Sequence, residues 1–138
     1  MSIDERLAEI REHLDRLTPA QASREVEAGA VIIDIRPARQ RTTEIPGSLI
    51  IERNHLEWRL DPTSGAAVPV ADTTSRWIVV CQQGYASSLA AESLRRIGLD
   101  ATDVIDGIDG WAVAGLPVVA GPSDVESFVE LPDERNTA

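Results

Sequence analysis

The sequence feature that most constrains the fold is the segment 77–97, where a short apolar run leads through a brief loop into a helical pattern. Residues 77–80 are apolar and mostly β-branched, which is typical of a strand buried on both faces of a parallel sheet. The helical pattern begins at Ser87, and Gly98 follows it as a plausible C′ residue. This strand–loop–helix unit predicts an α/β chain.

Cys81, the only cysteine in the chain, ends the predicted strand. The loop after it contains Gly84, which can adopt conformations that turn backbone N–H groups inward. Converging N–H groups and the positive end of a helix dipole both favour an anion. A lone buried cysteine is usually an inert apolar side chain. This setting instead favours a reactive thiolate or persulfide, and we expect Cys81 to be a nucleophile.

The N-terminal region predicts two helices. Residues 3–17 carry apolar side chains at alternating steps of four and three, which is one face of an amphipathic helix. We expect this face to pack on the domain, because two heptads are short for the alternative, a dimerisation seam. Thr18 and Pro19 have the character of an N-cap and first residue of a second helix, which ends at Gly29.

The remaining pattern alternates short strands with helical turns, which predicts a parallel sheet with helices on both faces. Beyond Gly121 the chain is acidic and contains proline, and we expect a loosely attached tail. Strands are predicted at 31–36, 49–51 and 103–105, and helical turns at 52–60 and around Trp111. The expected organisation is an N-terminal helix, one α/β domain and an acidic tail, over residues 1–18, 19–120 and 121–138.

Composition excludes several classes of function. A net charge of −10 argues against binding of nucleic acid or of anionic lipid. All 13 basic residues are arginine, which excludes lysine-based chemistry. His13 and His55 with one cysteine leave no credible zinc cluster, and we expect no metal and no cofactor. No apolar run approaches a membrane span, the start is too charged for a signal peptide, and one cysteine cannot form an internal disulfide, so we expect a cytoplasmic protein.

Three segments of the sequence together resemble a known family. IDIRPARQ with IPGS, then VVCQQGYASS, then VIDGIDGWAVAGLPV are similar, in this order, to the signature segments of single-domain rhodaneses. The resemblance covers roughly residues 20–120. It implies a rhodanese-like three-layer fold with a central, mostly parallel sheet and helices on both faces, to which the N-terminal helix is an addition. It also implies that Cys81 carries sulfane sulfur as a persulfide.

The resemblance further implies the partners and the binding residues. A small donor, thiosulfate or a persulfide, would load Cys81, and cyanide, a thiol or a cysteine of a partner protein would accept the sulfur. Arg36 is a candidate for orienting an anionic donor, although a structural pair with Asp34 is the favoured interpretation. The loop would cradle the outer sulfur with its backbone amides, through Gln82, Gln83, Gly84, Tyr85, Ala86 and Ser87.

Other side chains near the predicted site have simpler interpretations. Ser87 and Ser88 are expected to be helix caps before any role in sulfur binding. Tyr85 is expected to line the mouth of the pocket. Trp58 and Trp111 are expected to pack in the core or at the pocket rim.

The sequence departs from the family pattern at two positions. Many single-domain members have an arginine where this chain has Ala86, and a histidine where it has Glu44. Loss of the loop arginine removes a cation that could bind thiosulfate. Phosphatase relatives have a loop one residue longer and need an arginine directly after it, and Ser87-Ser88-Leu89 provides none. The alternatives to sulfur transfer are a rhodanese-fold binding or regulatory module and a redox-sensing thiol.

Overall fold

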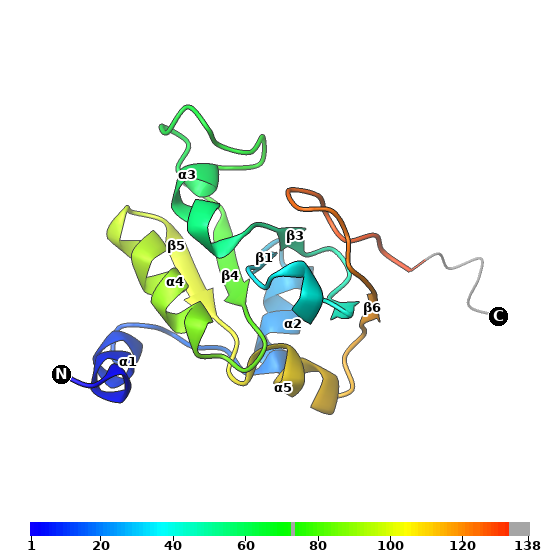
Figure 1. Ribbon diagram of the computed structural model, residues 1–138, viewed down its shortest axis with the longest axis horizontal. Coiled ribbons are helices and arrows are strands. Elements are labelled where there is room, and N and C mark those ends of the chain that lie inside the picture. The colour runs from blue at the N-terminus through cyan, green and yellow to red at the C-terminus, as the bar shows by residue number, and fades with distance from the viewer. Residues whose placement is uncertain (73, 133–138) are drawn as a thin grey trace.

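A four-stranded parallel sheet in the order β3-β1-β4-β5 forms the centre of the structure (Figure 1). The computed structural model describes residues 1–72 and 74–132. The central strands are β1 (Val31–Asp34), β3 (Leu49–Ile50), β4 (Arg76–Val80) and β5 (Asp100–Asp103). A separate antiparallel pair consists of β2 (Thr43–Glu44) and β6 (Val119–Ala120).

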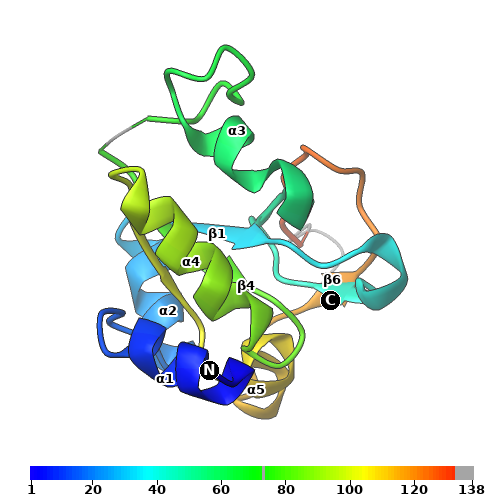
Figure 2. The ribbon, with the colours of Figure 1, turned by 60° about the vertical axis from the view of Figure 1, so that its left-hand side comes forward.

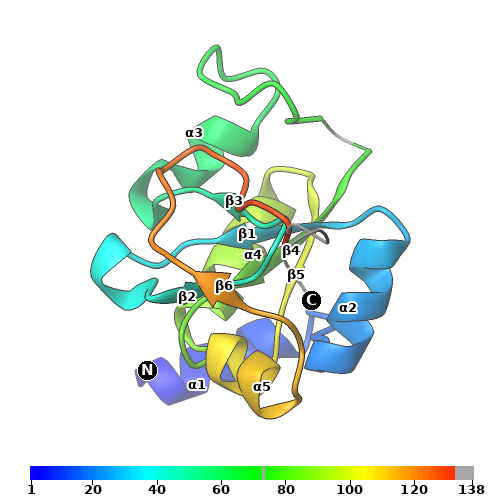
Figure 3. The same cartoon turned by 90° about the vertical axis from the view of Figure 1, so that its right-hand side faces the viewer.

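Helices cover both faces of the sheet, which confirms the predicted layered α/β arrangement (Figures 2 and 3). One face carries α1 (Ile3–Arg11), α3 (Leu56–Leu60) and α4 (Ala86–Arg96). The other face carries α2 (Pro19–Glu27) and α5 (Gly107–Val113). Two 3-10 turns, η1 (Ala38–Gln40) and η2 (Arg53–His55), complete the described elements.

Burial on both faces explains why the central strands are continuous apolar runs. Along β4, Trp77 and Val79 pack on the α4 side, whereas Ile78 and Val80 pack on the side of α2 and α5. All four side chains are buried. Since burial of one large aliphatic side chain contributes about 1.5–3 kcal/mol, this strand anchors both layers. Cys81 follows directly and continues the alternation toward α4.

The predicted start and end of the second helix are confirmed. Thr18 Oγ1 accepts a hydrogen bond from the Gln21 backbone N–H at 3.2 Å, and Gln21 Oε1 accepts one from the Thr18 N–H at 2.9 Å. This reciprocal pair is a capping box. Gly29 follows the helix with a φ of 109°, a conformation that favours glycine.

The prediction of one helix over 3–17 is wrong beyond Arg11. After a turn, the chain extends and Leu17 pairs with Val104 beside β5. The Leu17 N–H donates to Asp103 O at 3.0 Å, and its carbonyl accepts from Ile105 N at 2.8 Å. Pairing with the sheet therefore replaces helical hydrogen bonds here. The apolar spacing persists because Leu14 and Leu17 are both buried, but from non-helical backbone.

The last central strand starts three residues and ends two residues before the predicted 103–105, at Asp100–Asp103. The sequence did not indicate this strand because Thr102 and Asp103 are polar, although both are fully buried and hydrogen-bonded to the N-terminal segment and, for Asp103, also to α4. Thr102 Oγ1 donates to Asp15 O at 2.9 Å. A helical turn around Trp111 is confirmed as α5, and Trp111 Nε1 donates to Pro117 O at 2.9 Å in the core.

The segment after Gly121, predicted to be loosely attached, is held against β3 over its described part. Val129 exchanges backbone hydrogen bonds with Gly47 and Ser48 at 2.9 and 2.8 Å. Ser123 donates from its backbone and hydroxyl to the buried Glu44 carboxylate at 2.9 and 2.8 Å. The acidic composition did not reveal these contacts, because backbone groups make most of them. Residues 133–138 lie outside the described residues.

Helix α3 is tied to α4 through Glu57. Burial raises the pKa of Glu57, but hydrogen bonds from Ser93 and from the backbone, with the charge of Arg53, outweigh it and lower the pKa below its usual value. The carboxylate is therefore ionised at neutral pH.

Trp58 is 60% exposed on the outside of α3, so its predicted packing in the core or pocket rim is wrong. Within the described ranges no helix is long and apolar enough to cross a bilayer.

We expect Val129→Ala to lower the free energy of unfolding by about 1–2 kcal/mol, because it removes two buried methyl groups. The matched control is Val113→Ala, since Val113 is 89% exposed and Val129 only 3%. Val113→Ala should change stability by less than about 0.5 kcal/mol. Urea denaturation measures both. Equal, negligible effects would contradict the docking of the C-terminal segment.

Candidate functional site

The Cys81 sulfur lies inside a loop of backbone amides at the carboxyl end of β4. Its Sγ accepts hydrogen bonds from the backbone N–H groups of Gly84 at 3.2 Å and Ser87 at 3.3 Å. The side chain is 7% exposed and packs against the α4 face of the sheet. Two converging N–H donors favour negative charge on sulfur. Of the loop amides predicted to cradle the outer sulfur, those of Gly84 and Ser87 are directed at Sγ itself.

Gly84 can only be glycine in this loop. Its φ is 87°, and a Cβ there would lie 2.9 Å from the backbone N of Asp106 and 3.2 Å from Val104 O. Close packing of the loop on the segment after β5 fixes this conformation. The Gly84 N–H is thereby directed at Sγ.

The start of α5 supports the loop from the neighbouring strand end. Ile108 N–H donates to the Cys81 carbonyl at 2.9 Å, and Asp109 N–H donates to the Gln82 carbonyl at 3.1 Å. Gly107 has a φ of 57°, and a Cβ at this position would lie 2.2 Å from Cys81 O. The main chain of Cys81 thus packs directly against Gly107.

Gln82 is fixed by its side chain on both sides. Its Nε2 donates to Asp109 Oδ1 at 2.7 Å, and its Oε1 accepts from Arg36 Nη1 at 2.9 Å. Gln82 therefore connects β1, the loop and α5. Its side-chain amide is occupied by protein partners rather than directed at a ligand.

The contacts of Arg36 favour the structural pair with Asp34, the preferred interpretation of the sequence, over the candidate role of orienting an anionic donor. Its guanidinium donates to both oxygens of Asp34, to Gln40 O, to Thr43 O and to Gln82 Oε1. These bonds use all five N–H donors of the side chain, which is buried. The structural pair with Asp34, at 2.8 Å, is the correct interpretation.

Ser87 and Ser88 are not helix caps as predicted. Their hydroxyls donate to Asp103 Oδ2 at 2.7 and 2.8 Å, and α4 begins without a side-chain cap. Asp103 is fully buried. The two serines therefore attach the start of α4 to the end of β5, and they hold the Ser87 N–H against Sγ.

Sequence reasoning missed two arginines that contact the loop. Arg11 Nη2 and Arg16 Nη2 donate to the Gly84 carbonyl at 2.8 and 3.0 Å. They come from α1 and the extended segment after it, 73 and 68 residues away along the chain. No local motif marks them, because the amphipathic pattern simply assigns both to a polar helix face.

Gln83, Tyr85 and Ala86 form the exposed side of the loop. Tyr85 is 58% exposed, and the Arg11 guanidinium lies 5.7 Å from the centre of its ring. Beside the loop is a cavity of about 410 Å³ with two acidic side chains, lined by Gln83, Tyr85, Asp106, Asp109, Gly110 and Val113. The surface next to the site is thus acidic, as the net charge suggests.

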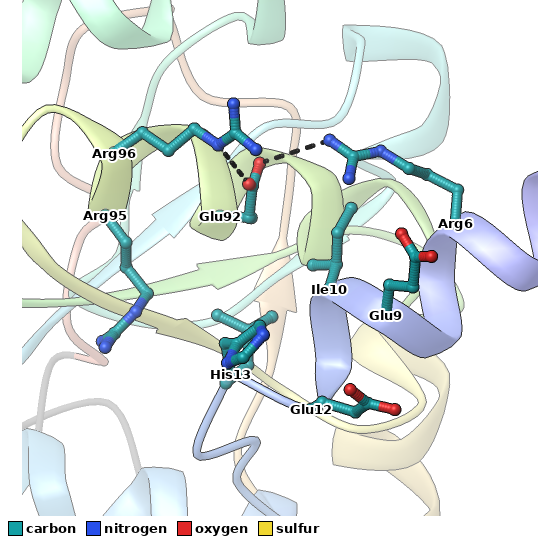
Figure 4. Close-up of a pocket in the computed structure, with 9 residues that line it drawn as sticks. Arg6, Glu9, Ile10, Glu12, His13, Glu92, Arg95 and Arg96 are labelled. Carbon is teal, nitrogen blue, oxygen red and sulfur yellow. Dashed lines mark hydrogen bonds and ion pairs between the residues drawn. The ribbon is translucent and has the colours of Figure 1, made fainter.

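A second cavity, of about 600 Å³, lies between α1 and α4 (Figure 4). Glu92 projects into it between Arg6 and Arg96 and forms ion pairs with both. Its lining includes neither Cys81 nor any residue of the loop. Acids and arginines alternate around it, and we assign it no part in the site.

Comparison with known proteins places this geometry in context. The family model described as the rhodanese-like domain matches residues 18–114. The adenylyltransferase and sulfurtransferase MOCS3 of Arabidopsis thaliana is 34% identical over 92 residues, which are 59% of this chain and 20% of that protein. The chain therefore spans about a fifth of the length of this curated relative.

Solved structures show the same fold. A protein of unknown function from Rhodopseudomonas palustris, described as a possible tyrosine phosphatase, is 32% identical with a TM-score of 0.77, over 86% of this chain and 95% of that one. A rhodanese-related protein from Thermoplasma volcanium is 25% identical with a TM-score of 0.62, over 75% and 96%. A thiosulfate sulfurtransferase from Pseudomonas aeruginosa is 24% identical with a TM-score of 0.71, over 94% and 24%.

We expect Gly107→Ala to displace the Cys81 main chain, because the new Cβ would overlap Cys81 O. Gly115→Ala is the matched control, since Gly115 also has a positive φ, of 75°, with no atom within 4 Å of a Cβ. The control should cost about 1–2 kcal/mol of stability from the backbone conformation alone. Gly107→Ala should lower the free energy of unfolding by at least about 2 kcal/mol more than the control does. It should also slow the alkylation of Cys81. Similar values for both variants would show that the contact does not position the cysteine.

Proposed function

The chain belongs to the family of rhodanese-like domains, and from this premise we propose that it is a sulfurtransferase that carries sulfane sulfur as a persulfide on Cys81. The observation that supports this most is the pair of backbone N–H groups, from Gly84 and Ser87, directed at Sγ. Neither donor is a side chain, so the loop favours a charged sulfur without a dedicated general base.

The proposed reaction is a double displacement. The Cys81 thiolate attacks the sulfane sulfur of thiosulfate, a new S–S bond forms, and the old S–S bond breaks with its electron pair leaving on sulfite. The enzyme then holds a Cys81 persulfide. An acceptor such as cyanide attacks the outer sulfur, the S–S bond to Cys81 breaks, and thiocyanate and the thiolate are released. This is covalent catalysis by an activated nucleophile.

The loop residues have distinct parts in this proposal. The Gly84 and Ser87 amides stabilise Sγ as thiolate and as leaving group. Gln82 contributes by its fixed position between Arg36 and Asp109, which holds the first peptides of the loop in place. Gln83, Tyr85 and Ala86 are exposed and would contact the donor or acceptor.

Electrostatics favours a persulfide over thiosulfate as the donor. Thiosulfate is a dianion, and the cavity beside the loop presents Asp106 and Asp109. Ala86, exposed at the first turn of α4, offers no cation to the sulfonate group. Arg36, the other candidate, has all its donors occupied within the protein. A less charged small-thiol or protein persulfide would not meet this repulsion.

Tyrosine phosphatase activity is the second candidate, because the R. palustris relative is described as a possible phosphatase. The loop of this chain does not favour it. Phosphoryl transfer needs cationic side chains on the equatorial oxygens, and the loop and first turn of α4 contain no arginine. Arg11 and Arg16 contact the loop at the Gly84 carbonyl, and no bond from either to Cys81 is present in the described structure.

We expect incubation with thiosulfate or a small-thiol persulfide to add the mass of one sulfur atom to the protein, and cyanide to remove it. Cys81→Ser should abolish both the mass increase and thiocyanate production while leaving the fold intact. Intact mass spectrometry and a colorimetric thiocyanate assay measure these outcomes. Turnover by the variant would contradict the mechanism. A sulfenic acid without any persulfide would instead favour the redox-sensing alternative.

The same protein should not hydrolyse p-nitrophenyl phosphate above the rate of Cys81→Ser. Phosphate release that depends on Cys81 would favour the phosphatase candidate over sulfur transfer.

We expect Ala86→Arg to lower the KM for thiosulfate by about ten- to a hundredfold, since a charge-assisted hydrogen bond contributes roughly 1.5–3 kcal/mol. The control is Ala20→Arg, which adds the same charge at an exposed position on α2. Steady-state kinetics at fixed ionic strength gives the KM for thiosulfate of both variants. If the control improves KM equally, overall charge rather than a local cation limits thiosulfate use.

A further inference from the structure

Two guanidinium groups bind one carbonyl oxygen on the outside of the Cys81 loop. Arg11 Nη2 lies 2.8 Å and Arg16 Nη2 lies 3.0 Å from Gly84 O. Both residues precede the part of the chain that the rhodanese family model matches, residues 18–114. The extra N-terminal segment therefore contacts the loop directly. We call this pair of arginines the N-terminal clamp.

Each arginine of the clamp is held in place by a second contact. Arg16 donates to both oxygens of the buried Asp103 carboxylate, at 2.9 and 3.2 Å. Arg11 Nε donates to Ser88 Oγ at 3.1 Å. Asp103 and Ser88 also support the start of α4. The clamp is thus part of the same hydrogen-bonded network as the loop, not a pair of mobile surface side chains.

The clamp orients and polarises the peptide group between Gly84 and Tyr85, because both arginines donate to its carbonyl oxygen. A trans peptide is planar, and its C=O and N–H point in opposite directions. With the Gly84 carbonyl directed at the arginines, the Tyr85 N–H points away from them. Two charged donors on a carbonyl polarise its peptide group and strengthen the N–H as a donor. The charge of Arg16 is balanced by Asp103, so the Arg11 guanidinium is the positive charge that the clamp adds behind a loop with no charged side chain of its own.

We propose that Arg11 and Arg16 are positioning residues that fix the turn at Gly84, whose own N–H donates to Cys81 Sγ, and so stabilise negative charge on that sulfur and on the outer sulfur of a persulfide. Neither touches the reacting atoms. Their role replaces, from behind the loop, part of the charge that an arginine at Ala86 would supply inside it. The inference rests on the proposed sulfur transfer for its catalytic meaning, but the effect on the cysteine can be measured separately.

The decisive variants are Arg11→Gln and Arg16→Gln, with Lys at each position as the conservative substitution. Arg11→Gln keeps the Arg16–Asp103 ion pair, so it removes half of the clamp without leaving a buried carboxylate unpaired. Arg6→Gln is the matched control. It removes the same charge from the same helix, and Arg6 pairs with Glu92 rather than with the loop.

We expect Arg11→Gln to raise the pH midpoint of Cys81 alkylation by iodoacetamide by about half a unit, and the double Gln variant by about one unit. Arg6→Gln should leave the midpoint unchanged. Lys at either position should restore most of the midpoint, because it restores the charge. In nuclear magnetic resonance spectra, the Tyr85 amide nitrogen should move upfield in the Gln variants.

A folded Arg11→Gln variant with the midpoint and Tyr85 resonance of the wild type would overturn the proposal. An equal shift in Arg6→Gln would also overturn it, since the effect would then be one of net charge. The proposed function is tested apart from this, by persulfide formation on the wild type. If no persulfide forms while the alkylation midpoints shift as expected, sulfur transfer fails and the clamp stands.

Discussion

The site depends most on the hydrogen bonds and the ion pair that the buried Asp103 carboxylate forms. It receives hydrogen bonds from Arg16, Ser87 and Ser88, so the end of β5, the start of α4 and the N-terminal segment meet at one group. A fully buried charge is costly unless it is paired and hydrogen-bonded. Removing one partner of such a pair costs about 3–5 kcal/mol. The orientation of the Ser87 N–H toward Cys81 therefore follows from a requirement of folding.

A second buried pair holds the opposite side of the loop. Asp34 and Arg36 lie at the end of β1, and Arg36 reaches Gln82 directly after the cysteine. The Cys81 loop is thus fixed between two arginine–carboxylate pairs, one at the end of each strand that flanks β4. In this arrangement the arginines stabilise the shape of the loop, and the backbone amides contact the sulfur.

The sequence was most informative where function depends on consecutive residues. A buried strand, Cys81, Gly84 and a helix start fall within one short segment, and their geometry follows from local rules. The sequence was least informative where buried polar groups meet over long separations. Arg11 and Arg16 reach Gly84 across 73 and 68 residues. The sequence of β5 does not resemble a buried strand, because Asp100 is exposed and the buried Thr102 and Asp103 bond to groups far along the chain. The family resemblance located the Cys81 loop but could not extend to residues before its first segment.

The N-terminal segment around Leu17 and the C-terminal segment around Phe128 pair with the edges of the central sheet, which limits how those edges can associate with another chain. A four-stranded parallel sheet has two edges with unpaired N–H and C=O groups, which are templates for association with another chain. Here Leu17 bonds to the outer side of β5, and the strand-like stretch around Phe128 bonds to the outer side of β3. The edge of β3 is covered along the strand, and the edge of β5 is covered at its carboxyl end. The molecule therefore presents less unpaired backbone for edge-to-edge association at the end of the sheet where Cys81 lies.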